Sequence, residues 1–237
     1  MLIMTWRLFT IAVMFAMIAG LTVRGEVAAQ ETPETDPAFD YASVDGLTDV
    51  VSRTYSGDLS SLYGDVDLAS GATPDVSALG TFSISSVIFR FEDDGKAEAG
   101  FGTITDFLTE ALQSGDEEVG ELNEVEVDGF GDNTRARSGT IDIAGMATTV
   151  FAMATQDGEY VYYTAVVSFA GEESAQDAGA AFTTVVKDRD AGDGAVDLRG
   201  DGTSSGGLFD KYPEADDEVV ANLTADYDEQ LYPEPAS

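Results

Sequence analysis

The chain contains neither histidine nor cysteine among its 237 residues. Without histidine it cannot build a Ser-His-Asp or Cys-His catalytic centre, a histidine proton shuttle or an ordinary zinc site. Without cysteine it forms no disulfide, so the fold must depend on its core and on any bound ions. These two absences exclude the commonest hydrolytic mechanisms and favour a domain without catalytic function.

Basic residues are also scarce. There are 11 Lys and Arg residues against 45 Asp and Glu residues, for a net charge of −34, and the lysines are Lys96, Lys187 and Lys211. Direct nucleic-acid binding is disfavoured, because phosphate contacts need clustered basic side chains. The charge is typical of a soluble, salt-adapted surface whose self-repulsion is screened by salt. A face that binds cations or polycations is the alternative interpretation.

Tryptophan occurs once, as Trp6, inside an apolar N-terminal segment. A mature chain without tryptophan is a poor candidate for stacking on sugars, although tyrosine could substitute. Paired carboxylates could still hydrolyse glycosides. With so many acids in the chain, however, no particular pair stands out.

The N-terminus predicts export. An apolar run of 16 residues from Leu8 to Val23 is followed by Val27 and Ala29, small residues at the −3 and −1 places of a signal-peptidase site. We therefore expect residues 1–29 to be a signal peptide, with no membrane span left after cleavage and a secreted or extracytoplasmic destination. An uncleaved membrane anchor is the alternative, although the run is short against the roughly 20 residues of a spanning helix.

Hydrophobic spacing predicts the elements of a domain over residues 46–187. In "SISSVIFRFED", Val87, Phe89 and Phe91 share one face, and polar residues share the other face with Ile88, which predicts a half-buried strand. Two amphipathic helices are also predicted, with apolar faces made of Ala97, Phe101, Ile104, Leu108 and Ala111 in one and of Ala175, Ala178, Phe182 and Val185 in the other.

Three further strands are predicted between these helices, over residues 134–169. The runs "TRARSGTIDI", "MATTVFAMATQ" and "EYVYYTAVVSF" are separated by Ala144-Gly145 and by Asp157-Gly158. An Asp-Gly pair between alternating runs is a strong hairpin signal. We therefore expect an antiparallel meander whose last strand turns one set of side chains to one face, namely Val161, Tyr163, Ala165, Val167 and Phe169.

Polar or irregular segments flank this domain. Residues 30–45 are interpreted as a flexible linker, 188–207 as an Asp/Gly-rich linker and 208–237 as an acidic C-terminal segment with a short docked helix. The helical spacing behind that last interpretation involves Val219, Val220, Leu223 and Tyr227. Similar helical spacing precedes the first strand, at Leu47, Val50, Val51 and Tyr55.

The order of elements implies an α+β fold, an antiparallel sheet with helices packed on one face. The stretches "SSVIFRFEDDGKAEAGFGTITDFL", "EVEVDGFGDNTRARSGTI" and "DGEYVYYTAVVSF", with the final helix, resemble small exported bacterial domains. These are the extracellular sensor domains of receptor kinases and PsbP-like lipoprotein domains. The resemblance covers about residues 84–187 and implies an exported sheet-and-helix domain. It carries over no functional residue, and the paired cysteines usual in the kinase sensors are missing here.

The candidate ligand site combines scarce arginines with clustered tyrosines. Guanidinium groups favour carboxylates and phosphates, and exposed aromatic rings favour ligands or partners. Pairing with neighbouring acids and cover by a helix are the alternative interpretations. The residues of this candidate site are Arg90, Arg135, Arg137, Tyr160 and Tyr162.

Two other motifs are candidate sites, one for a metal ion and one for glycosylation. The closely spaced acids Asp188, Asp190, Asp193 and Asp197 could supply oxygen ligands to Ca²⁺. Their spacing departs from the EF-hand loop, however, and a solvated acidic linker is the favoured interpretation. Asn222 begins an N-glycosylation sequon, which matters only in a host that glycosylates exported proteins.

Together these features predict a secreted or envelope-associated, non-catalytic domain that binds a small ligand or an envelope protein. No cofactor is expected apart from possible Ca²⁺. A calcium- or salt-dependent surface protein is one alternative, and a carboxylate-based hydrolase is the other.

Overall fold

The structure, a computed structural model, describes residues 39–57, 80–113, 122–143, 146–193, 197–198, 204–214, 217–221 and 223–232. The predicted signal peptide, the first part of the predicted linker 30–45 and the sequon residue Asn222 lie outside the described residues.

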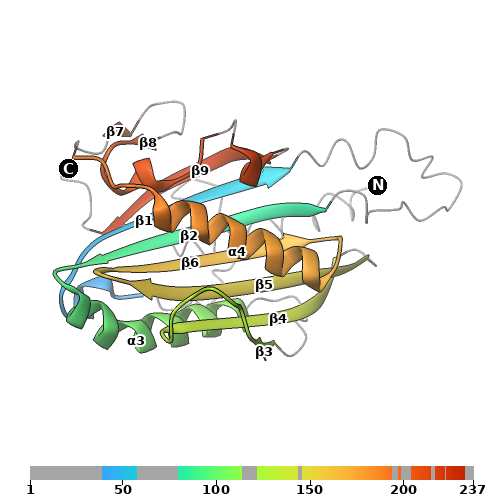
Figure 1. Cartoon of the computed structure of the whole chain (residues 1–237), viewed down its shortest axis with the longest axis horizontal. Helices are drawn as coiled ribbons and strands as arrows, with labels where there is room; N and C mark the ends of the chain where they lie inside the picture. The colour runs from blue at the N-terminus through green and yellow to red at the C-terminus, as the bar shows by residue number, and fades with distance from the viewer. Residues whose placement is uncertain are drawn as a thin grey trace, which may run out of the picture.

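A seven-stranded antiparallel sheet forms the centre of the fold, in the order β3-β4-β5-β6-β2-β1-β9 (Figure 1). Its strands are β1 Leu47–Gly57, β2 Thr81–Phe91, β3 Asn123–Val125, β4 Thr134–Ile143, β5 Met146–Asp157, β6 Tyr160–Ser168 and β9 Leu223–Tyr232. The helices are α3 Asp94–Gln113 and α4 Glu172–Asp188. The predicted α+β class with an antiparallel sheet is confirmed.

Short elements complete the described chain. They are the 3-10 turns η1 Tyr41–Ser43, η4 Gly207–Lys211 and η5 Glu218–Val220, and a small two-stranded ladder of β7 Asp197–Leu198 and β8 Ser204–Ser205. The predicted linker 188–207 therefore contains paired backbone. The predicted linker 30–45 also has structure in its last part, where the ring of Phe39 packs 4.3 Å from Phe107.

The predicted meander is confirmed as β4, β5 and β6, which pair in chain order. The hairpin turn between β5 and β6 falls one residue later than predicted, because Asp157 pairs with Tyr160 and leaves Gly158 and Glu159 as the loop. Gly158 has φ +57°, the left-handed conformation that such a two-residue turn requires and that glycine adopts without strain.

The two helices pack on opposite faces of the sheet, which corrects the prediction that they share one face. α3 buries Ile104 in the same cluster as Val87 and Phe89, whereas α4 buries Phe182 in the same cluster as Ile88. Neighbouring residues of a strand point to opposite faces, so β2 is covered on both sides. Ile88 therefore does not break the pattern, because its face is also core.

β1 was predicted as a short helix and is a strand. Val50 belongs to the α3-side cluster, and Val51 and Tyr55 belong to the α4-side cluster. A strand that is buried on both faces loses the period-two pattern of a half-exposed strand. Its apolar residues then fall by chance at helical spacing, and pairing with β2 and β9 decides the outcome.

The predicted C-terminal helix is also a strand. After the turn η5, β9 pairs with β1 and forms one edge of the main sheet, so the described part of the segment 208–237 belongs to the domain. The register shifts between Ala225 and Tyr227, where β9 carries one extra residue. Such a bulge moves later side chains to the other face, which hides the strand pattern from inspection of the sequence.

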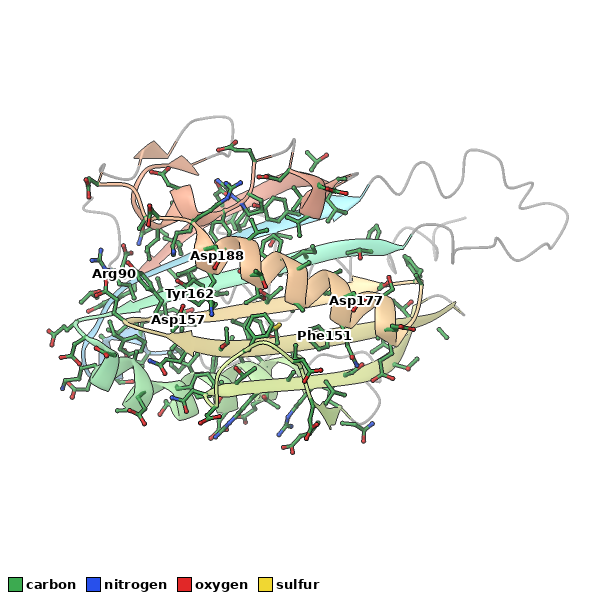
Figure 2. All side chains as sticks on the ribbon, in the orientation of Figure 1. Arg90, Phe151, Asp157, Tyr162, Asp177 and Asp188 are labelled. Atoms are coloured by element: carbon green, nitrogen blue, oxygen red, sulfur yellow. The ribbon has the colours of Figure 1, made fainter. Side chains whose placement is uncertain are left out.

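α4 lies across the front of the sheet in Figure 1, and Phe151 of β5 lies beneath it in Figure 2. Its buried residues are Ala175, Gly179, Phe182, Thr183 and Val186. The predicted face named Ala178 and Val185, which are half-buried. A Cβ at Gly179 would lie 2.5 Å from the Phe151 ring, so glycine there permits the close approach of helix and sheet.

Candidate functional site

The structure does not bring the five predicted ligand residues together. Strand alternation places Tyr160 and Tyr162 on the α4 face with Arg90, whose guanidinium lies 5.9 Å from the Tyr160 ring. Arg135 and Arg137 lie on the α3 face, since Ala136 between them belongs to the α4-side cluster. The five candidate residues therefore do not line one cavity, and each half has its own surroundings.

The tyrosine half contacts the chain's own lysine. The Nζ atom of Lys211 lies 5.0 Å from the Tyr160 ring centroid and 5.5 Å from that of Tyr162, distances at which a cation is attracted to an aromatic face. The ammonium also donates to the carbonyl oxygens of Lys187 and Arg189, at the end of α4. Burial lowers the pKa of Lys211.

The same C-terminal segment covers more of this face. The Tyr212 hydroxyl lies 3.2 Å from the carbonyl oxygen of Val51 and 2.9 Å from that of Ser86, in the middle of the sheet. The Arg53 guanidinium stacks against Tyr212 and forms a buried ion pair with Asp228. The α4 face is thus filled by η4 and its neighbours, which makes it a poor place for an external ligand.

The arginine half borders a small hollow between α3 and the sheet, called here the α3 hollow. It has a volume of about 30 Å³ and is lined by Thr105, Asp106, Thr109, Leu112, Arg135, Arg137, Ala152, Met153, Ala154 and Tyr163. α3 supplies one wall, and β4, β5 and β6 supply the other.

Arg135 and Arg137 form the rim of this hollow. Nη1 of Arg135 donates to Thr105 Oγ1 and Asp106 Oδ1, each at 3.0 Å, and its guanidinium lies over the Phe101 ring. Nη2 of Arg137 lies 3.5 Å from Glu124 Oε1. The pairing with neighbouring acids anticipated from the sequence therefore does occur. Because the carboxylates are 80% and 85% exposed, each pair is weak, worth about 0–1 kcal/mol.

Tyr163 brings a buried polar group to the lining of the hollow. The residue is 4% exposed, and its hydroxyl is buried without a hydrogen-bond partner in the part of the chain that the structure describes. Burial raises the pKa of Tyr163, so the phenol stays protonated and can donate. A buried hydroxyl without a partner costs roughly 1–3 kcal/mol, which a ligand oxygen could recover.

Sequence reasoning placed Tyr163 in the core and missed its place in the site. The sequence did distinguish Tyr163, because it is the one residue with a hydroxyl among the alternate residues from Val161 to Phe169 that were predicted to face the core. A buried phenol normally needs an acceptor, and no neighbour in that set supplies one. Thr105 and Thr109 carried no such signal, since their place on the inner side of α3 depends on packing.

The four aspartates predicted to bind calcium do not form a recognisable metal site among the described residues. Asp188, Asp190 and Asp193 are exposed around the end of α4, and the side chain of Asp197 lies outside the described set. Within the described residues, no group of three or more acidic side chains is arranged to hold a metal ion. Calcium binding remains a prediction that rests on the sequence.

A buried carboxyl lies apart from the hollow, on the edge strand β9. Oε2 of Glu229 and Oγ of its cross-strand neighbour Ser52 are both buried without hydrogen-bond partners among the described residues. Burial raises the pKa of Glu229 to about 7, and a hydrogen bond from Tyr227 lowers it in part. The carboxyl also raises the pKa of Tyr41, which burial has already raised.

This shift predicts that stability falls as pH rises. Glu229 keeps its proton up to about pH 7 in the folded chain but only up to about pH 4.5 in the unfolded chain. Its protonation therefore contributes fully to the free energy of unfolding below pH 4.5, and this contribution is lost as the pH rises through about 7. At 1.36 kcal/mol per pKa unit this is roughly 3 kcal/mol, which solvent screening reduces to about 1–2 kcal/mol. Glu229→Gln should therefore gain about 1–2 kcal/mol at pH 8 and almost nothing at pH 4, measured by urea unfolding.

The control for this prediction is Glu218→Gln, which removes an equal charge at an exposed position in η5. It accounts for the general effect of reducing the net charge of −34. Equal gains by the two variants at pH 8 would show that Glu229 is not specially destabilised when ionised.

Neither a protein-family model nor a curated protein matches this sequence. Among solved structures, the extracellular domain of PknH from Mycobacterium tuberculosis is similar, with a TM-score of 0.36 and 13% identity over 61% of this chain and 68% of that chain. A match at this level carries no argument about ligands or partners. None of the described helices has the length and hydrophobicity needed to cross a membrane.

Proposed function

We propose that this chain is an exported, non-catalytic domain that binds a small ligand in the α3 hollow. The observation that carries the proposal is the combination of two arginines on the rim with the buried, unpartnered hydroxyl of Tyr163 in the lining. Ligand sites are typically concave and largely apolar, with a few placed polar groups that fix orientation. The α3 hollow combines such polar groups with apolar lining residues that include Leu112 and Ala154.

Export is proposed from the N-terminal 29 residues, and lack of catalysis from the absence of histidine and cysteine. Mass spectrometry of the intact protein tests export. A chain that begins at Gln30 in the extracytoplasmic fraction would support it, whereas a full-length chain in the cytoplasm would contradict it. A ligand-binding role needs no proton transfer, so the chemistry of the hollow is sufficient for it.

A calcium- or salt-dependent surface protein is the second candidate. It is favoured by the exposed carboxylates of Asp188, Asp190 and Asp193, which follow one another closely in a chain of net charge −34. Calcium prefers such oxygen ligands, and salt screens the repulsion between them. This function would act through the end of α4 and would be independent of the α3 hollow.

Ligand-dependent melting of the purified mature chain tests both candidates. The panel would contain neutral sugars, amino acids, carboxylates, organic phosphates and CaCl₂. A ligand at 100 times its Kd adds about 2.7 kcal/mol to the free energy of unfolding, which raises Tm measurably. We expect at least one small-molecule class to raise Tm in the wild type and not in the Arg135→Gln/Arg137→Gln double variant.

The matched control is Arg90→Gln, which removes an arginine from the opposite face of the sheet. This variant should keep the full shift in Tm. If no small molecule stabilises the wild type, or if the shift persists in the double variant, the α3 hollow is not the ligand site. A shift caused by CaCl₂ alone, unchanged in the double variant, would instead support the second candidate.

A further inference from the structure

We infer that the ligand group entering the α3 hollow is a carboxylate, an inference that rests on the proposed ligand-binding function of that hollow. Two arginines from the same strand and one tyrosine from β6 supply the polar contacts. The inference depends on which hydrogen-bonding roles in the hollow are already taken, on the local charge and on the available space.

The buried and the cationic groups that remain for a ligand are donors, whereas the exposed Asp106 carboxylate at the rim is an acceptor. The hydroxyls of Thr105 and Thr109 donate to the α3 carbonyl oxygens of Gly102, at 3.0 Å, and Thr105, at 2.8 Å. The guanidinium groups of Arg135 and Arg137 have donors only, and the buried Tyr163 hydroxyl has a proton to give. A ligand that satisfies this set must therefore present acceptor oxygens, as an oxyanion does.

The local charge favours a single negative charge over two. Arg135 and Arg137 are balanced by Asp106 and Glu124, so these four groups sum to zero. A carboxylate adds one negative charge beside them, and a phosphate dianion adds nearly two, in a chain that already carries −34. The more highly charged ligand meets the stronger repulsion from Asp106 and from the surrounding surface.

The acids on the rim do not close the hollow to a carboxylate. The side chains of Asp106 and Glu124 are 80% and 85% exposed, so each can turn into water at little cost when a ligand oxygen takes its place. Arg135 is held against α3 by its bond to Thr105, so its guanidinium stays in position. The Arg137 side chain is 35% exposed, against 56% for that of Arg135.

The volume of the hollow sets the size of the inserted group. About 30 Å³ accommodates a group of a few heavy atoms and no whole metabolite. In the proposed pose, the two oxygens of a carboxylate point into the hollow toward Tyr163 and the arginines, and its carbon faces the opening. The rest of the ligand would extend out of the hollow.

Titration of ¹⁵N-labelled mature chain with sodium butyrate, sodium phosphate and butyramide tests the inference, with the arginine Nε–Hε signals as the readout. Ionic strength is held constant with NaCl. Butyramide has the shape of butyrate without its charge. We expect butyrate to shift the Arg135 and Arg137 signals saturably, phosphate to bind at least 10-fold more weakly, and butyramide to give no saturable shift.

Two variants locate the binding. Arg137→Gln should weaken butyrate at least 10-fold, and Tyr163→Phe should weaken it about threefold or more, because each removes a donor to the ligand oxygens. The matched control is Tyr162→Phe, which removes a hydroxyl from the neighbouring residue on the other face of β6. It should leave the affinity for butyrate unchanged. Equal losses in the two tyrosine variants would overturn the role of Tyr163.

The outcomes separate this inference from the proposed function. Tighter binding of phosphate than of butyrate, still dependent on Arg137, would overturn the carboxylate assignment and leave a ligand site. Equal binding of butyramide and butyrate would do the same, since charge would then play no part. If no probe binds but the melting panel yields a ligand that needs Arg135 and Arg137, the carboxylate assignment fails and the proposed ligand-binding function stands. If no compound of the panel raises Tm either, the assignment and the proposed function both fail.

Discussion

Arg53→Met is expected to lower the free energy of unfolding by about 3–5 kcal/mol. Nε and Nη2 of Arg53 bond to the two carboxylate oxygens of Asp228 at 2.6 and 2.8 Å, and the side chains are 8% and 2% exposed. Removing the arginine would leave a carboxylate charge buried between β1 and β9, whose desolvation is no longer compensated. Urea unfolding at neutral pH, monitored by far-UV circular dichroism, measures the loss.

The double variant Arg53→Met/Asp228→Leu should recover most of that loss. Replacing both members of a buried ion pair by apolar residues is often neutral or stabilising, because neither charge is then left without a partner. The matched control is Lys96→Met, which breaks the exposed ion pair with Asp45 and should cost much less, because exposed ion pairs contribute little. A loss in Arg53→Met no larger than this would show that β9 is held by other contacts.

Phe182→Ala is expected to cost about 3–5 kcal/mol, the usual range for deleting a fully buried phenylalanine. Phe182 is 0% exposed and projects from α4 against Tyr55 of β1, with ring centroids 5.4 Å apart and the rings edge to face. The substitution would remove the aromatic contact and leave a cavity between helix and sheet. Urea unfolding of the mature chain again gives the difference in free energy.

Two valines of α4 provide the control for this second prediction. Val186 is 1% exposed and Val185 is half-buried, although the sequence pattern predicted Val185 on the inner face. Val186→Ala should therefore cost about 1–2 kcal/mol more than Val185→Ala, since only the first leaves a cavity. The reverse order would mean that α4 is rotated from the orientation described, and the reason given for the effect of Phe182 would fail with it.

The meander and the helices could be predicted because their signals are local. Gly158 marks a turn by its own conformational freedom, and Asp93 begins α3 by accepting a hydrogen bond from the backbone N–H of Lys96 at 2.9 Å. Alternation along β6 correctly placed Tyr162 and Tyr163 on opposite faces. Each of these inferences needs only residues a few positions apart.

The site was only partly predictable for the same reason. The sequence correctly indicated that Arg135 and Arg137 share a face, because they are two residues apart in a strand. It could not show that Arg90 lies on the opposite face of the sheet from them, nor that the ammonium group of Lys211 lies over the rings of Tyr160 and Tyr162. Those relations depend on the fold of segments that are far apart in the chain.

By itself, the sequence determined the chemistry that this chain lacks, its strongly negative charge and the segments that alternate or repeat with helical spacing. Only the tertiary structure decided that β1 and β9 are strands, that α3 and α4 cover opposite faces, and that a hollow forms under α3. The physical reason is that local propensities are worth tenths of a kcal/mol per residue. Burial of side chains between distant segments, such as Phe182 of α4 against Tyr55 of β1, is worth several kcal/mol.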